Sequence, residues 1–72
     1  MALNRTSALS ELEHRVLRLS ATGMATPEVA DRLGVSPDEV RFHIRRAMAA
    51  LGARSKLEAV VLALRAGLIE LA

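Results

Sequence analysis

Residues 36–52, SPDEVRFHIRRAMAALG, are the stretch of this sequence that decides the fold. Ser36 can cap the N-terminus of a helix, the proline after it suits the first helical position, and Glu39 completes a capping box three residues after the serine. Gly52 can adopt the left-handed conformation that ends a helix. These signals predict a complete helix over residues 37–51.

The predicted helix has two unlike faces. At about 100° per residue, one narrow stripe of it is apolar and is formed by Val40, Ile44, Ala47 and Leu51. Phe42, the only aromatic residue of the chain, points almost opposite to this stripe, and Arg45 and Arg46 flank it. Such a helix is built to press its outer face against a partner, and the DNA major groove is the first candidate.

Similar start and stop signals predict three further helices, over about residues 10–22, 27–33 and 56–66. Ser10 and Ser55 each precede a glutamate by three residues and predict capping boxes, and Thr26 is expected to cap the second helix. No segment alternates with a period of two for long enough to indicate a strand. The sequence therefore predicts an all-α four-helix domain.

Only Gly34, Val35 and Ser36 separate the second and third helices. So short a link forces a sharp angle, and Gly34 lets the chain turn where other residues would be strained. Two short helices joined by a tight turn containing glycine are typical of the helix-turn-helix. Spacing alone leaves open a generic helical bundle with no role in nucleic-acid binding.

Composition excludes several classes of function. The chain has 72 residues, enough for one domain, and no cysteine, which rules out disulfides and thiolate metal sites. Two isolated histidines, His14 and His43, cannot form a metal site alone, so we expect no metal and no cofactor. We expect no catalytic residues and no enzyme, because no cluster of His and acids and no Gly-rich phosphate loop is present.

The ends and the hydropathy of the chain point to the cytoplasm. The longest apolar run, residues 59–64, is too short to span a bilayer. The first ten residues lack the hydrophobic region of a signal peptide. We therefore expect a cytoplasmic protein without a membrane partner.

Basic charge is concentrated on the 37–51 helix and the loop after it. The net charge is only +2, yet residues 40–57 hold five basic side chains and no acid. This distribution is expected of a local phosphate-binding surface. An ordinary solvated arginine face is the alternative.

Four motifs follow one another along most of the chain: Leu9-Ser10-x-x-Glu13-x-x-Val16-Leu17, Glu28-Val29-Ala30-x-x-Leu33, Val40-Arg41-x-His43 and Leu51-Gly52-x-Arg54-Ser55-x-x-Glu58-Ala59. In this order and spacing, from Leu9 to about Ile69, the sequence resembles the DNA-binding domain of LuxR-type (GerE-like) bacterial transcription regulators. The resemblance implies an N-terminal arm over residues 1–8 and a helix-turn-helix domain over residues 9–72.

The resemblance also implies roles for individual residues, with 37–51 as the recognition helix and 56–66 as the dimerisation helix. The candidates for base contacts are Arg41, Phe42, Arg45 and Arg46. Apart from the resemblance, Thr26, Arg54 and Lys56 are candidates for phosphate contacts, because helix N-terminal amides favour anions, with capping and solvation as the alternative. The candidates for the dimer interface are Ala59, Val60, Ala63, Leu64 and Ala66.

The 56–66 helix is apolar nearly all round and must be covered on both sides. One side is expected to meet the core and the other a symmetry-related copy, since two-fold contacts are the commonest arrangement. The alternative is that residues 68–71 fold back over that surface within one monomer.

Three residues depart from the family pattern. Glu39 stands where Thr is usual, and it repels phosphate unless it folds back onto the Ser36 amide. Ala49 and Ala50 occupy positions where Lys or Arg is common, and each lost phosphate contact flattens the salt dependence by about 0.9 units of slope. The isolated domain is therefore expected to bind DNA weakly.

The sequence thus predicts a transcription regulator, or its output domain, that binds double-stranded DNA sequence-specifically as a homodimer on a pseudo-palindromic site. One rival is a sigma-factor-like helix-turn-helix with RNA polymerase as its partner. The other is a helical protein-interaction module that has lost DNA binding, which Glu39, Ala49 and Ala50 favour.

Overall fold

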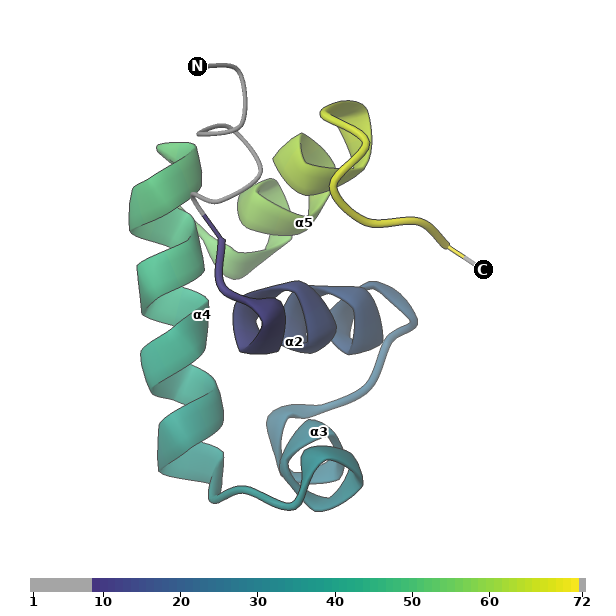
Figure 1. Cartoon of the computed structure of the whole chain (residues 1–72), viewed down its shortest axis with the longest axis vertical. Coiled ribbons are helices and arrows are strands. Elements are labelled where there is room, and N and C mark those ends of the chain that lie inside the picture. Colours follow the sequence, from purple (N-terminus) through teal and green to yellow (C-terminus); the bar gives the residue numbers. More distant parts are fainter. Residues whose placement is uncertain (1–8, 72) are drawn as a thin grey trace.

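A computed structural model describes residues 9–71, which form four helices and no strand (Figure 1). The helices are α2 (Glu11–Ala21), α3 (Thr26–Leu33), α4 (Pro37–Leu51) and α5 (Lys56–Arg65). The predicted all-α fold is confirmed, and each predicted helix is present to within about a residue. The predicted N-terminal arm, residues 1–8, lies outside the described residues.

Helix α2 occupies the centre of the molecule. Figure 1 shows α3 on one side of it and α5 on the other, with α4 running alongside all three. Helices α2 and α4 each pack against the other three, whereas within residues 9–71 α3 and α5 make no contact with each other. The arrangement separates the helix-turn-helix end of the domain from the α5 end.

The core consists of small aliphatic side chains, as the composition predicts. The largest fully buried residues are Val16, Leu17, Val29 and Val40. Each such side chain contributes about 1.5–3 kcal/mol when fully buried. Leu17 follows Val16 directly, so it lies about 100° further round α2 than Val16 does. It is buried because α2 is central and is covered on more than one side.

The link between α3 and α4 is a tight left-handed turn. Gly34 has a φ of +72°, and its N–H donates to the Asp31 carbonyl at 3.3 Å. The Val35 N–H donates to the Ala30 carbonyl at 3.0 Å, which completes a Schellman motif. In Figure 1, α3 is seen nearly end-on while α4 lies in the plane of the picture, so the two axes cross at a steep angle.

Two of the predicted capping boxes are present in full. Ser10 and Ser36 each accept the N–H of the third helical residue, and the glutamate at that position accepts the N–H of the serine. The third box is half formed, which corrects the prediction for α5. Ser55 accepts the Glu58 N–H at 3.0 Å, but the Glu58 carboxylate accepts from the Arg54 N–H instead, at 2.6 Å.

The predicted cap at Thr26 is wrong by one residue. Ala25 is the N-cap, with an extended backbone (φ −75°, ψ 158°), and Thr26 is the first residue of α3. Ala25 has no side-chain oxygen to offer, so the helix start is held by the Glu28 carboxylate, which accepts the Ala25 N–H at 2.9 Å. With Ala25 as the N-cap, the helix begins at Thr26, one residue earlier than the sequence predicts.

We predict that Gly34→Ala lowers the free energy of unfolding by about 1 kcal/mol, because a Cβ is strained at positive φ. An added Cβ at this position meets no atom within 4 Å, so backbone strain is the whole cost. Urea denaturation measures the change. Gly34→Asn is the control and is expected to cost less, since Asn tolerates this conformation better. Equal losses for the two variants would contradict this explanation.

Candidate nucleic-acid interface

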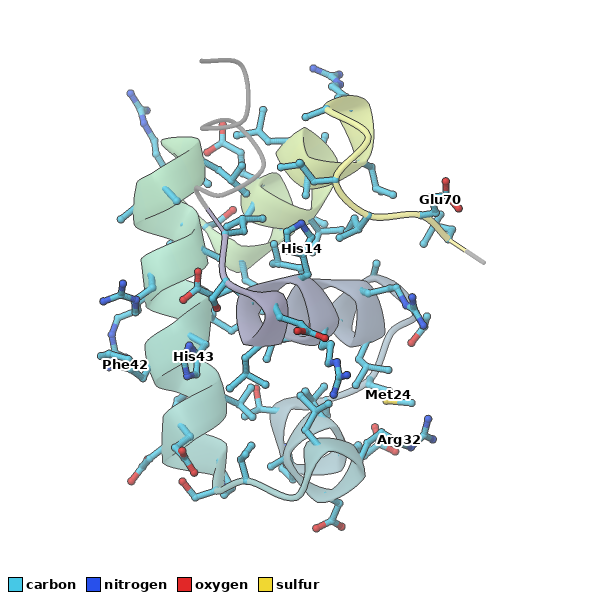
Figure 2. All side chains as sticks on the ribbon, viewed as in Figure 1. His14, Met24, Arg32, Phe42, His43 and Glu70 are labelled. Carbon is cyan, nitrogen blue, oxygen red and sulfur yellow. The ribbon has the colours of Figure 1, made fainter. Side chains whose placement is uncertain are left out.

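Helix α4 buries one stripe and exposes the rest of its circumference. Val40, Ile44 and Ala47 are buried against the other helices, as predicted. On the opposite face Phe42 is 48% exposed, and Figure 2 shows it pointing away from the body of the molecule. A small domain that leaves its only aromatic residue outside presents a surface suited to a partner.

The arginines of this face differ in how strongly they are held. The Arg41 guanidinium pairs with the Asp38 carboxylate one turn earlier, with both side chains more than half exposed. The Arg45 side chain is exposed and makes no hydrogen bond or ion pair within residues 9–71. Arg45 therefore has all of its donors available.

Arg46 is tied to a buried glutamate on α2. Its Nε donates to Glu13 Oε2 at 3.2 Å, and His43 Nδ1 lies 3.2 Å from the same oxygen. The other carboxylate oxygen, Oε1, accepts the Ser10 N–H at 3.0 Å. The Glu13 side chain is only 4% exposed, whereas that of Arg46 is 62% exposed. Arg46 is thus anchored at its Nε while its terminal nitrogens face outward.

The Glu13 carboxylate is ionised in the folded protein despite its burial. Burial raises its pKa. Hydrogen bonds from the Ser10 backbone N–H, His43, Arg46 and the Ser10 side chain lower the pKa by more than burial raises it. The net pKa lies below the ordinary value of 4.5. A buried carboxylate without such partners would instead be driven toward its neutral form.

Phe42 joins the same cluster on the outer face. The Arg46 guanidinium carbon lies 5.6 Å from the centre of the Phe42 ring, a cation–π distance. The Phe42 and His43 rings meet edge to face, with centroids 5.2 Å apart and planes at 79°. We call Glu13, Phe42, His43 and Arg46 the Glu13 cluster.

Sequence reasoning found the members of the Glu13 cluster but not their connection. It placed Glu13 in a capping box, which the structure confirms, and it treated His43 only as an isolated histidine. It treated Arg46 as an outward side chain with no partner. The available signal was that His43 and Arg46 stand three positions apart, so they share one edge of the helix.

Glu39 folds back on the start of its own helix. Its carboxylate accepts the Ser36 N–H at 3.2 Å, and its N–H donates to the Ser36 hydroxyl at 3.1 Å. The structure thus shows the arrangement in which this acidic residue is occupied as a cap. Ala49 and Ala50 are exposed and add no charge to the surface.

The predicted phosphate-contact residues lie at two helix starts. Thr26 is half-buried in the first turn of α3. Arg54 and Lys56 stand on either side of Ser55, the N-cap of α5. Arg54 is exposed and Lys56 is half-buried. Both basic residues follow the end of α4 directly, so the positive charge continues from the helix into the loop.

Most of the residues predicted for the pairing surface of α5 lie inside the monomer. Three of the five predicted residues are buried in the core of the monomer: Ala59, Val60 and Ala63. Leu64 is half-buried and Ala66 is exposed, so only these two reach the surface. Alanine lets a helix approach its neighbours closely, which explains why the small residues face inward.

The open apolar side of α5 carries larger residues instead. Leu57 is 72% exposed and Val61 is 37% exposed, and they are four positions apart on one face. The C-terminal residues 68–71, the predicted alternative cover for α5, leave part of its surface exposed. Ile69 is buried and Leu68 half-buried, yet Leu57 and Val61 remain open.

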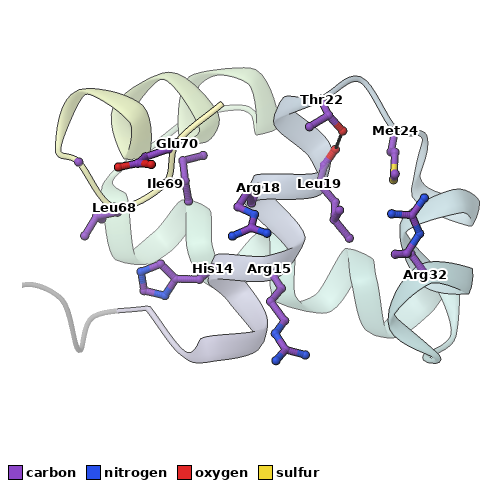
Figure 3. Close-up of a pocket in the computed structure, with 11 residues that line it drawn as sticks. His14, Arg15, Arg18, Leu19, Thr22, Met24, Arg32, Leu68, Ile69 and Glu70 are labelled. Atoms are coloured by element: carbon purple, nitrogen blue, oxygen red, sulfur yellow. Dashed lines mark hydrogen bonds between the residues drawn. The ribbon is translucent and has the colours of Figure 1, made fainter. Parts of the chain in front are cut away.

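An open groove of about 690 Å³ lies between α2, the loop after it and the C-terminal segment (Figure 3). Arg15, Arg18 and Arg32 line it together with Glu70, so its charge is mixed. Figure 2 places Arg32 and Glu70 on the side of the molecule away from Phe42. Between Leu9 and Leu71, no three His or acidic side chains gather closely enough to hold a metal ion.

The fold and the surface of α4 define the class of protein. A short helix, a tight glycine turn and a second helix with an exposed basic face form a helix-turn-helix DNA-binding domain. None of the helices in the described part of the chain has both the length and the apolarity that crossing a membrane requires.

A family model described as bacterial regulatory proteins, luxR family, matches residues 7–63. The chain therefore belongs to the LuxR family, and it is the DNA-binding domain of a transcription regulator of this kind, not an enzyme.

Individual relatives agree with this assignment. The chain is 40% identical over 63 residues to the spore germination protein GerE of Bacillus subtilis, covering 88% of this chain and 85% of that protein. It is 36% identical over 59 residues to a nitrate/nitrite response regulator protein homolog of Haemophilus influenzae, covering 82% of this chain but 28% of that protein. The solved structure of the transcription factor GerE superposes with a TM-score of 0.85 at 26% identity, covering 90% of this chain and 97% of that one.

We predict that Glu13 makes the stability of the domain sensitive to acid. Because its folded pKa lies below its unfolded value, its contribution is complete above the unfolded pKa and is lost as pH falls through the folded one. In urea titrations from about pH 7 down to pH 3, the stability advantage of the wild type over Glu13→Gln should therefore shrink below about pH 4.5. A difference that stays constant over this range would contradict the prediction.

Proposed function

We propose that this domain binds double-stranded DNA sequence-specifically, with α4 lying in the major groove. The observation that carries the proposal is the division of α4 into a buried stripe and an outer face bearing Phe42, Arg45 and Arg46. An α-helix fits the major groove, where every base pair presents a distinct pattern of donors and acceptors. The site of action is then the cytoplasm, where bacterial DNA lies.

The outer face offers two kinds of base contact. Arg45 is exposed with all its donors available and can bind guanine through O6 and N7 together. Phe42 presents an apolar surface to the methyl group of thymine. Arg41 must exchange its Asp38 carboxylate for a DNA acceptor, so its contact is partly offset by the ion pair it gives up. Arg46 reaches the groove from its anchored position on Glu13.

Phosphate contacts from the start of α3 and from the loop after α4 would fix the register of α4 in the groove. Thr26 stands in the first turn of α3, where backbone N–H groups favour anions. Arg54 and Lys56 extend the positive charge beyond the end of α4. Ala49 and Ala50 contribute none, so we infer that one copy of the domain binds weakly.

Pairing through α5 would supply the missing affinity. Leu57 and Val61 form an exposed apolar strip, which the half-buried Leu64 continues at the same helical spacing. A two-fold contact through this strip would present two copies of α4 to successive major grooves, about 34 Å apart. The matching DNA is a pseudo-palindrome. Of the predicted interface residues, Leu64 belongs to this strip, whereas Ala59, Val60 and Ala63 are buried.

Selection of bound duplexes from a random pool tests the proposal directly. We expect enriched sequences with two inverted half-sites about one helical turn apart. Enrichment only in the presence of RNA polymerase would support the sigma-factor-like alternative. Absence of binding even at low salt would overturn the proposal and favour a protein-interaction module.

Two arginine variants separate base reading from phosphate binding. Arg45→Ala should reduce discrimination between the selected duplex and a scrambled one by about 1–3 kcal/mol, since a base contact is lost. Arg54→Ala should weaken both duplexes about equally and lower the slope of log affinity against log salt by about 0.9. Fluorescence anisotropy at several salt concentrations measures both. If Arg45→Ala weakens both duplexes equally, Arg45 contacts phosphate and not a base.

A charged substitution tests the pairing surface. Val61→Glu should raise the dimer dissociation constant at least about tenfold, because an unpaired carboxylate in an apolar interface costs several kcal/mol. Sedimentation velocity with and without the palindromic duplex reports the change. Leu71→Glu is the control, because it adds the same charge at an exposed leucine outside α5. If both variants associate like the wild type, pairing does not use this strip.

A further inference from the structure

The Glu13 cluster links the core of the domain to its outer face. The glutamates that begin α3 and α4, Glu28 and Glu39, are exposed and serve only as caps of their own helices. Glu13 is buried, and it caps α2 with one oxygen while the other holds two residues of α4. Its second oxygen therefore acts between helices, on the helix that carries the proposed DNA contacts.

The anchor restricts Arg46 without using up its donors. Only the single N–H of Nε is taken by Glu13, and the two terminal nitrogens keep their four N–H groups. The guanidinium also lies over the Phe42 ring at 5.6 Å, and that ring meets His43 edge to face. The four side chains thus form a closed circuit of contacts that fixes both Phe42 and Arg46.

Such an anchor changes what Arg46 can bind. A long side chain that is free on a helix surface can turn toward either a base or the nearest phosphate. A side chain held before binding loses less freedom on binding, but it reaches only acceptors in front of its fixed position. The Glu13 charge adds a cost to any movement of Arg46 away from α2, because a buried carboxylate would lose a partner.

We propose that Glu13 is a positioning residue that determines the sequence specificity of this domain, by holding Arg46 and Phe42 as one preformed reading unit. This inference rests on the proposed function, and it assigns a role in DNA reading to a residue that DNA does not touch. Glu13 favours discrimination between sequences at the expense of non-specific affinity, since it withholds Arg46 from the phosphates.

The inference is tested by the opposite changes that it predicts in specificity and in non-specific affinity. Glu13→Gln keeps the size of the side chain and removes its charge. It should lower the ratio of affinities for the selected and scrambled duplexes about tenfold, the size of one base contact. Affinity for the scrambled duplex should stay equal or rise, with a salt slope steeper by about 0.9 as Arg46 turns to a phosphate. Anisotropy titrations at two salt concentrations, well below the melting temperature of each variant, measure both quantities.

Glu11→Gln is the matched control. It removes the same charge from the same helix, but Glu11 is exposed and pairs with Arg15, away from α4. The affinity ratio of this variant should equal that of the wild type. A Glu13→Gln variant that loses affinity for both duplexes in equal proportion would show a merely structural role and would overturn the inference.

A second substitution tests whether Glu13 acts through Arg46. In an Arg46→Ala background, Glu13→Gln should lower the affinity ratio by much less than tenfold, because only the contact through His43 to Phe42 is left for Glu13 to hold. An undiminished tenfold effect in that background would overturn the inference.

The state of Arg46 in the free protein separates this inference from the proposed function. Nitrogen NMR of the arginine side chains should show the Arg46 Nε–H ordered and slow to exchange with water, and that of Arg45 mobile. If the wild type discriminates between duplexes while Arg46 is as mobile as Arg45, this inference alone fails. If the wild type does not discriminate at all, the proposed function fails and takes the inference with it.

Discussion

The packing of α4 against α2 is the constraint on which the rest of the structure depends. Val40, Ile44 and Ala47 must be buried at i, i+4 and i+7 spacing, and this fixes the rotation of α4 about its own axis. Once that rotation is set, helical geometry alone turns Phe42 and Arg45 outward. The turn at Gly34 then sets where α3 meets α4, and the short loop after Gly52 sets where α5 begins.

Much of the fold follows from local chemistry and could be predicted from the sequence. Serine before a run of helical residues, with glutamate three positions later, marks a helix start by hydrogen bonds within four residues of chain. The predicted capping is wrong at the helix starts where two hydrogen-bonding arrangements compete. At α3 the glutamate alone holds the start and leaves Thr26 inside the helix, and at α5 the Glu58 carboxylate accepts the Arg54 amide in place of the Ser55 amide.

The candidate site likewise has one part that local sequence predicts and another that only tertiary packing decides. Periodicity is sufficient to turn Phe42 outward, because direction on a helix is a local property. It does not show that Arg46 meets Glu13, since 33 residues separate them and only tertiary packing joins them. Nor does it decide which side of α5 faces the core. That helix is apolar nearly all round, so the choice rests on close approach, which places Ala59 inside and Leu57 outside.

The absence of contact between α3 and α5 within residues 9–71 bears on how such a domain can diverge. Changes at sites that share no neighbours add their effects independently. Substitutions on the exposed strip of α5 should therefore leave the turn at Gly34 undisturbed. Substitutions of the exposed side chains on α4, such as Phe42 and Arg45, should likewise leave the exposed strip of α5 in place. The proposed DNA reading and the proposed pairing could thus be altered separately on one small scaffold, with α2 as the element on which both depend.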